Sequence, residues 1–156
     1  MKDAEKALIN YQNNQGRGFI LNVEGNPCSQ KRHRHAKRGR RIITYDPSSE
    51  DKKAFKAKVL EQIKGKPLKK PLALSVCFFI KRPKKHYRTG KFSHILKKNS
   101  PMLCIQKPDI DNLIKFVLDA CNDVLWEDDK LVYEIQSRKV YSENPRTEIE
   151  VWEYVS

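Results

Sequence analysis

The 156-residue sequence has no long hydrophobic run. A membrane span needs about 18 or more consecutive apolar residues, and a signal peptide needs an apolar core near its start. Neither pattern is present, so we expect a soluble, cytoplasmic protein with no membrane partner. The four cysteines are spread singly, without a CxxC pair or finger-like histidine spacing, which argues against a zinc site or a disulfide framework.

Acidic residues are scarce in the first two-thirds of the chain. Residues 1–107 carry 27 Lys and Arg against 7 Asp and Glu, whereas residues 108–156 carry 5 against 12. The net charge of +13 and the pI near 9.7 indicate a polyanionic partner such as nucleic acid. A protein that only coats nucleic acid gains nothing from an acidic third. Carboxylates gathered there suggest a site that holds divalent cations for chemistry at phosphate.

Hydrophobic periodicity predicts a single α+β domain with a mixed sheet and two main helices, in the order ββαβαββ. The expected strands span residues 19–23, 42–45, 72–80, 131–141 and 147–155, and the expected helices span residues 50–64 and 109–125. Residues 1–18 are polar and aperiodic and are expected to be a leader to the domain at 19–156. Strand 72–80 is apolar on both alternating sets, which predicts a central strand buried on both faces. The turn residues 142–145 predict a hairpin of the last two strands.

Two segments are too basic to pack in a core. Residues 31–41 hold seven Lys or Arg and no acid, and residues 81–107 form a long basic loop. Contact with nucleic acid is the favoured interpretation of the first segment, and a disordered basic arm or a localisation tract is the alternative. The histidines of these segments are expected to contact phosphate or to be plain loop residues rather than metal ligands: they are His33, His35, His86 and His94.

The densest polar cluster is KPDIDNLIKFVLDACNDVLWEDD, residues 107–129. Asp109 and Asp111 stand at the start of the expected helix, and Lys115 follows Asp111 by one turn on about the same face. Such carboxylates suit Mg²⁺, and a nearby lysine offsets charge in the transition state of phosphodiester hydrolysis. Asn112 could orient a carboxylate or a bound water.

Two questions about this cluster stay open at this point. The helix would be roughly 25 Å long, so the sequence does not show whether Asp128 and Asp129 meet the acids at its start within one chain. Alternatively, the acids at the start are only helix caps, Lys115 is a solvated residue, and residues 127–129 form a turn.

The run KPDIDNLIKFVLDACNDVLWEDDKLV resembles the signature of the RusA family of Holliday-junction resolvases, which is D-x-D-N-x-x-K, then a helix, then an Asp-Asp pair that opens a strand. The N-terminal strand followed by GNPCSQKRHR is similar to the family's opening strand and basic loop. The resemblance implies a RusA-like, dimeric fold. It implies a Mg²⁺-dependent endodeoxyribonuclease, with Mn²⁺ as a substitute ion, that resolves four-way DNA junctions by paired symmetric nicks in recombination and repair. Its partners would be branched DNA and a second copy, with no small-molecule cofactor.

The resemblance also implies roles for residues of this sequence. The family's catalytic acids fall on Asp109, Asp111 and Asp129, and its essential lysine falls on Lys115. The implied metal ligands, with one supporting amide, are Asp109, Asp111, Asp128, Asp129 and Asn112. The basic loops would cradle the junction through Lys31, Arg32, Arg34, Lys37, Arg38, Arg40, Arg41, Lys84, Lys85, Arg88, Lys91, Lys97 and Lys98.

Two other functions are compatible with the residues. One is a non-catalytic basic nucleic-acid-binding protein, in which Asp111→Asn would leave every activity nearly unaltered. The other is a metal-dependent nuclease for other branched or flapped DNA. The resolvase interpretation predicts instead that this change removes cleavage while junction binding persists. It also predicts that activity falls on acidification, as the carboxylates take up protons.

Overall fold

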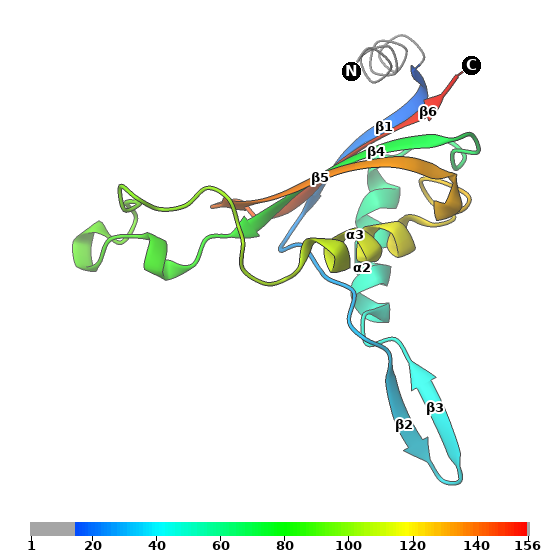
Figure 1. Cartoon of the computed structure of the whole chain (residues 1–156), viewed down its shortest axis with the longest axis horizontal. Coiled ribbons are helices and arrows are strands. Elements are labelled where there is room, and N and C mark those ends of the chain that lie inside the picture. Colours follow the sequence, from blue (N-terminus) through cyan, green and yellow to red (C-terminus); the bar gives the residue numbers. More distant parts are fainter. Residues whose placement is uncertain (1–14, 156) are drawn as a thin grey trace, which may run out of the picture.

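The computed structural model describes residues 15–155, and no helix in that range is long and apolar enough to cross a membrane. A four-stranded sheet and two α-helices form a body from which two projections extend (Figure 1). The strands are β1 (Gln15–Glu24), β2 (Arg34–Arg38), β3 (Arg41–Tyr45), β4 (Leu72–Lys81), β5 (Val132–Ser142) and β6 (Arg146–Tyr154). The helices are α2 (Ser49–Gln62) and α3 (Ile110–Cys121), with the short 3-10 turns η1 (Lys84–His86), η2 (Gly90–Phe92) and η3 (Asp129–Leu131). The predicted α+β class is confirmed.

The sheet has the strand order β1-β6-β4-β5. β6 pairs antiparallel with β1 and with β4, and β4 pairs parallel with β5. The central place predicted for residues 72–80 is confirmed, but the predicted hairpin of the last two strands is wrong because β4 lies between them. β5 and β6 lie two strand spacings apart, about 10 Å, which residues 143–145 can span. In this order the apolar β4 gains a hydrogen-bonded neighbour on each edge.

The basic segment contains a strand that the sequence did not predict. β2 pairs antiparallel with β3, so the element order is βββαβαββ rather than ββαβαββ. Gly39 and Arg40 close this hairpin, and Gly39 takes the positive φ of 64° that the tight turn requires. Every residue of both strands is exposed, so β2 has no apolar alternation to reveal it. We call residues 31–45 the basic hairpin; its segment is not a disordered arm but a two-stranded ribbon.

The hydrophobic core lies between one face of the sheet and the two helices. From β4, the side chains of Leu74, Val76 and Phe78 are almost fully buried. The rings of Phe55 in α2 and Phe116 in α3 meet edge to face, with their centroids 5.6 Å apart. Full burial of such side chains contributes about 1.5–3 kcal/mol each. This packing fixes α3 against the sheet, and with it the residues at both of its ends.

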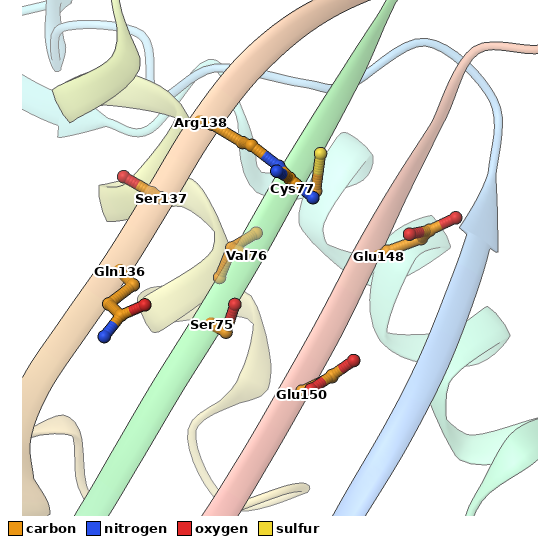
Figure 2. Close-up of a pocket in the computed structure, with 8 residues that line it drawn as sticks. All are labelled: Ser75, Val76, Cys77, Gln136, Ser137, Arg138, Glu148 and Glu150. Carbon is orange, nitrogen blue, oxygen red and sulfur yellow. The ribbon is translucent and has the colours of Figure 1, made fainter. Parts of the chain in front are cut away.

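Within residues 15–155, no helix covers the other face of β4, and long side chains of the neighbouring strands lie over it (Figure 2). Both α-helices lie on the same side of the sheet (Figure 1). Cys77 is only 9% exposed, and Figure 2 shows the Arg138 side chain reaching toward it from β5. The guanidinium of Arg146 lies 3.6 Å from the centroid of the Phe79 ring. The prediction of burial on both faces is confirmed on the side of α2 and α3. On the other face Ala73 and Cys77 are buried, whereas Phe79 is half-buried and Ser75 is exposed.

The start of β1 precedes the predicted strand. β1 begins at Gln15, so the last residues of the expected leader belong to the sheet. Gly18 lies against β6 so closely that a Cβ there would come within 2.2 Å of the Trp152 ring. The missing side chain explains why this stretch shows no strand pattern. Residues 1–14 of the expected leader lie outside the described residues.

Helix α3 ends at Cys121, before the predicted end at Leu125. Asn122 leaves the helical conformation, and its Oδ1 accepts a hydrogen bond of 2.9 Å from Trp126 Nε1. Asp123 has a positive φ of 63°. Leu125 and Trp126 are fully buried although the backbone has turned, so periodicity alone extends the helix too far.

Asp46 fastens the end of the basic hairpin to the start of α2. One oxygen of its carboxylate accepts from the Ser48 amide at 2.8 Å, and the other lies 2.7 Å from Lys52 Nζ. The hydrogen bond from Lys52, supported by the Ser48 amide, lowers the pKa of Asp46 to about 2. The carboxylate therefore stays ionised far into the acid range.

This pKa shift predicts how stability responds to acid. The folded pKa of Asp46 lies below its unfolded value of about 3.9, so its stabilising contribution is complete above about pH 4 and is lost as the pH falls toward 2. We expect Asp46→Asn to lower the free energy of unfolding at neutral pH by up to about 2 kcal/mol and to flatten its fall below about pH 4. Urea unfolding of both proteins across this range measures the two effects. An equally steep fall in the variant contradicts the assignment.

Candidate active site

Two candidate acids lie at the start of α3 and point to solvent. Asp109 is the N-cap residue in extended conformation, and its carboxylate makes no capping hydrogen bond. Asp111 lies in the first turn, and both acids are exposed. Lys139 of β5 holds the segment that precedes α3, because its Nζ donates to the carbonyls of Gln106 and Pro108. The Asp109 side chain is thus free of the capping role that was its simplest alternative.

Asp111 and Lys115 form an ion pair one turn apart on α3. The distance from Lys115 Nζ to Asp111 Oδ2 is 3.2 Å, and the two side chains are 61% and 62% exposed. The hydrogen bond from Lys115 lowers the pKa of Asp111. The pair therefore presents an ionised carboxylate beside an ammonium on an open surface, where both are available to a ligand. Asn112, between them in sequence, accepts a bond of 2.9 Å from the Gln30 amide through its backbone carbonyl.

The other two candidate acids lie after α3, where the chain turns into β5. Asp128 accepts a bond of 2.9 Å from the Lys130 amide and lies 3.2 Å from Lys130 Nζ. The bond from the Lys130 backbone, with help from its side chain, lowers the pKa of Asp128. Asp129 is the first residue of η3, and both acids are half-buried. Asp128 therefore stabilises this turn, as the simpler interpretation expected.

One chain does not bring the two pairs of acids together. α3 has 12 residues and is about 18 Å long; Asp109 and Asp111 lie at its start, and Asp128 and Asp129 follow its end. Between residues 15 and 155, no group of three or more His, Cys, Asp and Glu side chains is close enough to hold a metal ion. The donors suit a hard divalent cation chemically. Each end of α3 offers two of these carboxylates, so a site that used acids from both ends would not form within one chain.

The predicted DNA-contacting cations lie on the two projections. All of them are exposed: Lys31, Arg32, Arg34, Lys37, Arg38, Arg40 and Arg41 on the basic hairpin, and Lys84, Lys85, Arg88, Lys91, Lys97 and Lys98 on residues 82–107, which we call the basic arm. The arm runs directly into α3, while Gln30, just before the hairpin, contacts the first turn of α3 through Asn112. Both projections therefore begin close to the first turn of α3, which carries Asp111.

The basic arm is anchored by His86, which the sequence suggested as a phosphate contact or a plain loop residue. The residue is 7% exposed, and its ring meets Tyr141 of β5 edge to face with centroids 4.7 Å apart. Its carbonyl accepts from the Lys97 amide at 2.9 Å and from Ser100 Oγ at 2.6 Å. His86 thus connects the outgoing part of the arm, through its ring, to β5 and, through its carbonyl, to the returning part at Lys97 and Ser100.

A hollow of about 310 Å³ opens on the face of the sheet opposite α2 and α3 (Figure 2). Glu148 and Glu150 from β6 and Arg138 and Gln136 from β5 line it. Its two carboxylates disfavour phosphate, and it does not include any residue of the candidate site. The hollow is therefore a poorer candidate for a DNA-binding surface than the start of α3.

The sequence did not reveal the polar contacts that position these elements. Lys52 of α2 bridges Asp46 and Asp119, at 2.7 and 2.9 Å, and Gln30 Nε2 donates to Asp46 at 3.1 Å. The only sequence signal is that Asp119 follows Lys115 by four residues and so shares its stripe of α3. Nothing in the local pattern distinguishes Lys52 from other lysines of α2.

Comparison with known proteins decides the family. A family model described as "Endodeoxyribonuclease RusA" matches residues 24–152. The chain belongs to the RusA family. "Uncharacterized protein YqaN" of Bacillus subtilis (strain 168) is 31% identical over 133 residues, which cover 84% of this chain and 93% of that protein. The match to the RusA family includes the basic hairpin, the basic arm and α3.

Membership in the RusA family fixes the class of reaction. The protein is an endodeoxyribonuclease of the Holliday-junction resolvases, an enzyme whose partner is branched DNA. Nucleases of this family depend on divalent metal ions in general. The resemblance recognised in residues 107–132 is therefore confirmed at the level of family and enzyme class.

The environment of His86 predicts a pH effect on the basic arm. Burial, together with the charges of Arg82, Lys85 and Lys97, lowers the pKa of His86. Because the folded pKa lies below the unfolded value of about 6.5, the anchor is complete above that pH and weakens as the pH falls below it. We expect the hydrogen-exchange protection of the Lys97 amide, corrected for its intrinsic rate, to fall in that range. His86→Phe keeps an aromatic ring and should remove the pH dependence; an identical response in both proteins contradicts the role of His86.

Proposed function

We propose that this protein is a Mg²⁺-dependent, homodimeric resolvase that cuts four-way DNA junctions by paired symmetric nicks in recombination and repair. The observation that carries the proposal is the exposure of Asp109, Asp111 and Lys115 at the start of α3, close to the bases of two basic projections. Membership in the RusA family supports the reaction class. A phosphate backbone guided by both projections would pass over this end of α3.

Each group has its own part in the proposed reaction. The cations of the hairpin and the arm neutralise phosphates and release counterions. Lys115 adds positive charge where the phosphate gains negative charge in the transition state. When bound, Mg²⁺, or Mn²⁺ in its place, supplies further positive charge at the phosphate and a more acidic water. The proposed ligands, with their supporting amide, are Asp109, Asp111, Asp128, Asp129 and Asn112.

We propose that a second copy completes the site, because one chain keeps the two pairs of acids apart. In an isologous dimer the start of α3 in one copy can face the Asp128–Asp129 turn of the other, and the same contact then occurs twice. The two resulting sites are related by a two-fold axis. This arrangement suits the two opposed strands of a four-way junction.

Asp111→Asn tests the catalytic assignment. We expect single-turnover nicking of a synthetic four-way junction to fall by about 100-fold or more, while junction binding persists because a carboxylate that repels phosphate is lost. Asp123→Asn is the matched control, since Asp123 is exposed and its positive φ suits asparagine. Nicking by wild type should require Mg²⁺ or Mn²⁺ and stop with EDTA.

The substrates separate this proposal from its alternatives. Equal nicking of a linear duplex of matched sequence contradicts junction selectivity, and faster cutting of a flap indicates a nuclease for other branched DNA. Junction binding by wild type without any nick indicates a non-catalytic basic protein.

Mixing two inactive variants tests the shared site. A heterodimer of Asp111→Asn and Asp129→Asn chains has one site with both substitutions and one site with neither, if each site takes acids from two copies. We expect each variant alone to be inactive and the mixture, after exchange of subunits, to nick one strand of the junction. Sites contained within single chains would leave the mixture inactive. Wild type mixed with Asp111→Asn calibrates the efficiency of exchange.

A further inference from the structure

Lys52 of α2 connects the basic hairpin to α3. Its Nζ lies 2.7 Å from Asp46 Oδ2, at the end of the hairpin, and 2.9 Å from Asp119 Oδ2, on the third turn of α3. The Lys52 side chain is 17% exposed and that of Asp46 is 19% exposed, whereas Asp119 is 48% exposed. Lys52 therefore makes two ion pairs at once in a partly dry environment, where such contacts are worth more than on an open surface.

Both ends of the basic hairpin meet at this ion cluster. On the incoming side, Gln30 Nε2 donates to Asp46 at 3.1 Å, and the Lys31 amide donates to Ser48 Oγ at 2.9 Å. On the outgoing side, Asp46 itself is held by the Ser48 amide and by Lys52. Every residue of the two strands beyond this point is exposed. The direction of the hairpin is therefore set at its base.

Asp119 places the cluster on the same side of α3 as the candidate catalytic groups. Asp111, Lys115 and Asp119 follow one another at intervals of four residues, which puts them on one stripe of the helix. Through Asp119, the base of the hairpin is therefore connected to the stripe of α3 that carries Asp111 and Lys115.

We propose that Lys52 is a positioning residue that, by bridging Asp46 and Asp119, fixes the direction of the basic hairpin relative to the reactive end of α3. Its effect on cleavage rests on the proposed function. A phosphate held by the hairpin arrives at Asp111 and Lys115 only if the hairpin keeps its angle. Small misplacements of a reacting group cost up to about 100-fold in rate.

Lys52→Met removes the bridge and keeps most of the side-chain length. All cations of the hairpin remain, so we expect junction affinity to stay within about threefold of wild type, while the single-turnover nicking rate falls about tenfold or more. Cut sites should also spread to neighbouring phosphates. Lys52→Arg should restore most of the rate, because a guanidinium can serve two carboxylates.

Lys53→Met is the matched control. Lys53 is the next residue of α2, its side chain is 74% exposed, and its ion pair in the same helix is with Glu50 at 2.8 Å. The variant loses the same charge and should keep both the rate and the cut sites. If Lys52→Met does not fold, Asp119→Asn takes its place, since it removes only the α3 end of the bridge at a half-exposed side chain.

The direction of the hairpin can be measured without DNA cleavage. Amide residual dipolar couplings of residues 34–45 should fit the alignment tensor of the sheet in wild type and in Lys53→Met, and should be reduced or reoriented in Lys52→Met. Unchanged couplings in Lys52→Met overturn the proposal. Changed couplings with an unchanged nicking rate and unchanged cut sites overturn it as well. If wild type does not nick a junction, the proposed function fails, and the couplings alone decide whether the bridge positions the hairpin.

Discussion

The parallel pairing of β4 with β5 determines where the functional groups lie. Two parallel neighbours need a long connection that returns across the sheet, and here that connection contains the basic arm and α3. α3 must therefore start near the end of β4 and finish near its beginning. Lys139 of β5 contacts the loop before α3, and Leu68, just before β4, bridges to Trp126 after it. The acids that bracket α3 in sequence are held apart by the same topology that gives the sheet its core.

The sequence predicted the elements whose signals are local. The apolar stripe of α3 and the continuous run of β4 identified a helix and a central strand, and the motif at residues 107–132 identified the family. Contacts between distant segments were not accessible in this way. Nothing in the strands at the C-terminal end indicates that β4 would separate them, because their pairing is decided by burial of β4. Lys52 meets Asp119 across 67 positions, and neither residue stands out in its own helix.

The candidate basic and acidic groups lie on different parts of the structure. The candidate DNA-contacting cations project away from the body on the hairpin and the arm, whereas the candidate acids remain on the body at the two ends of α3 (Figure 1). In the proposed mechanism, steering and bond cleavage would use separate surfaces that meet at the start of α3. The face of the sheet opposite α2 and α3, with Glu148 and Glu150 in its hollow, belongs to neither surface.

The exposure of every residue of β2 and β3 allows the proposed DNA contacts of this ribbon to vary with little cost to the fold. Substitutions at positions that bury no side chain change stability little, and surface elements tolerate variation better than cores do. Side chains on this ribbon can therefore drift in charge and shape from one lineage to another while the sheet, α3 and the acids stay in place. If the ribbon contacts DNA as proposed, substrate preference is free to diverge faster than the reaction.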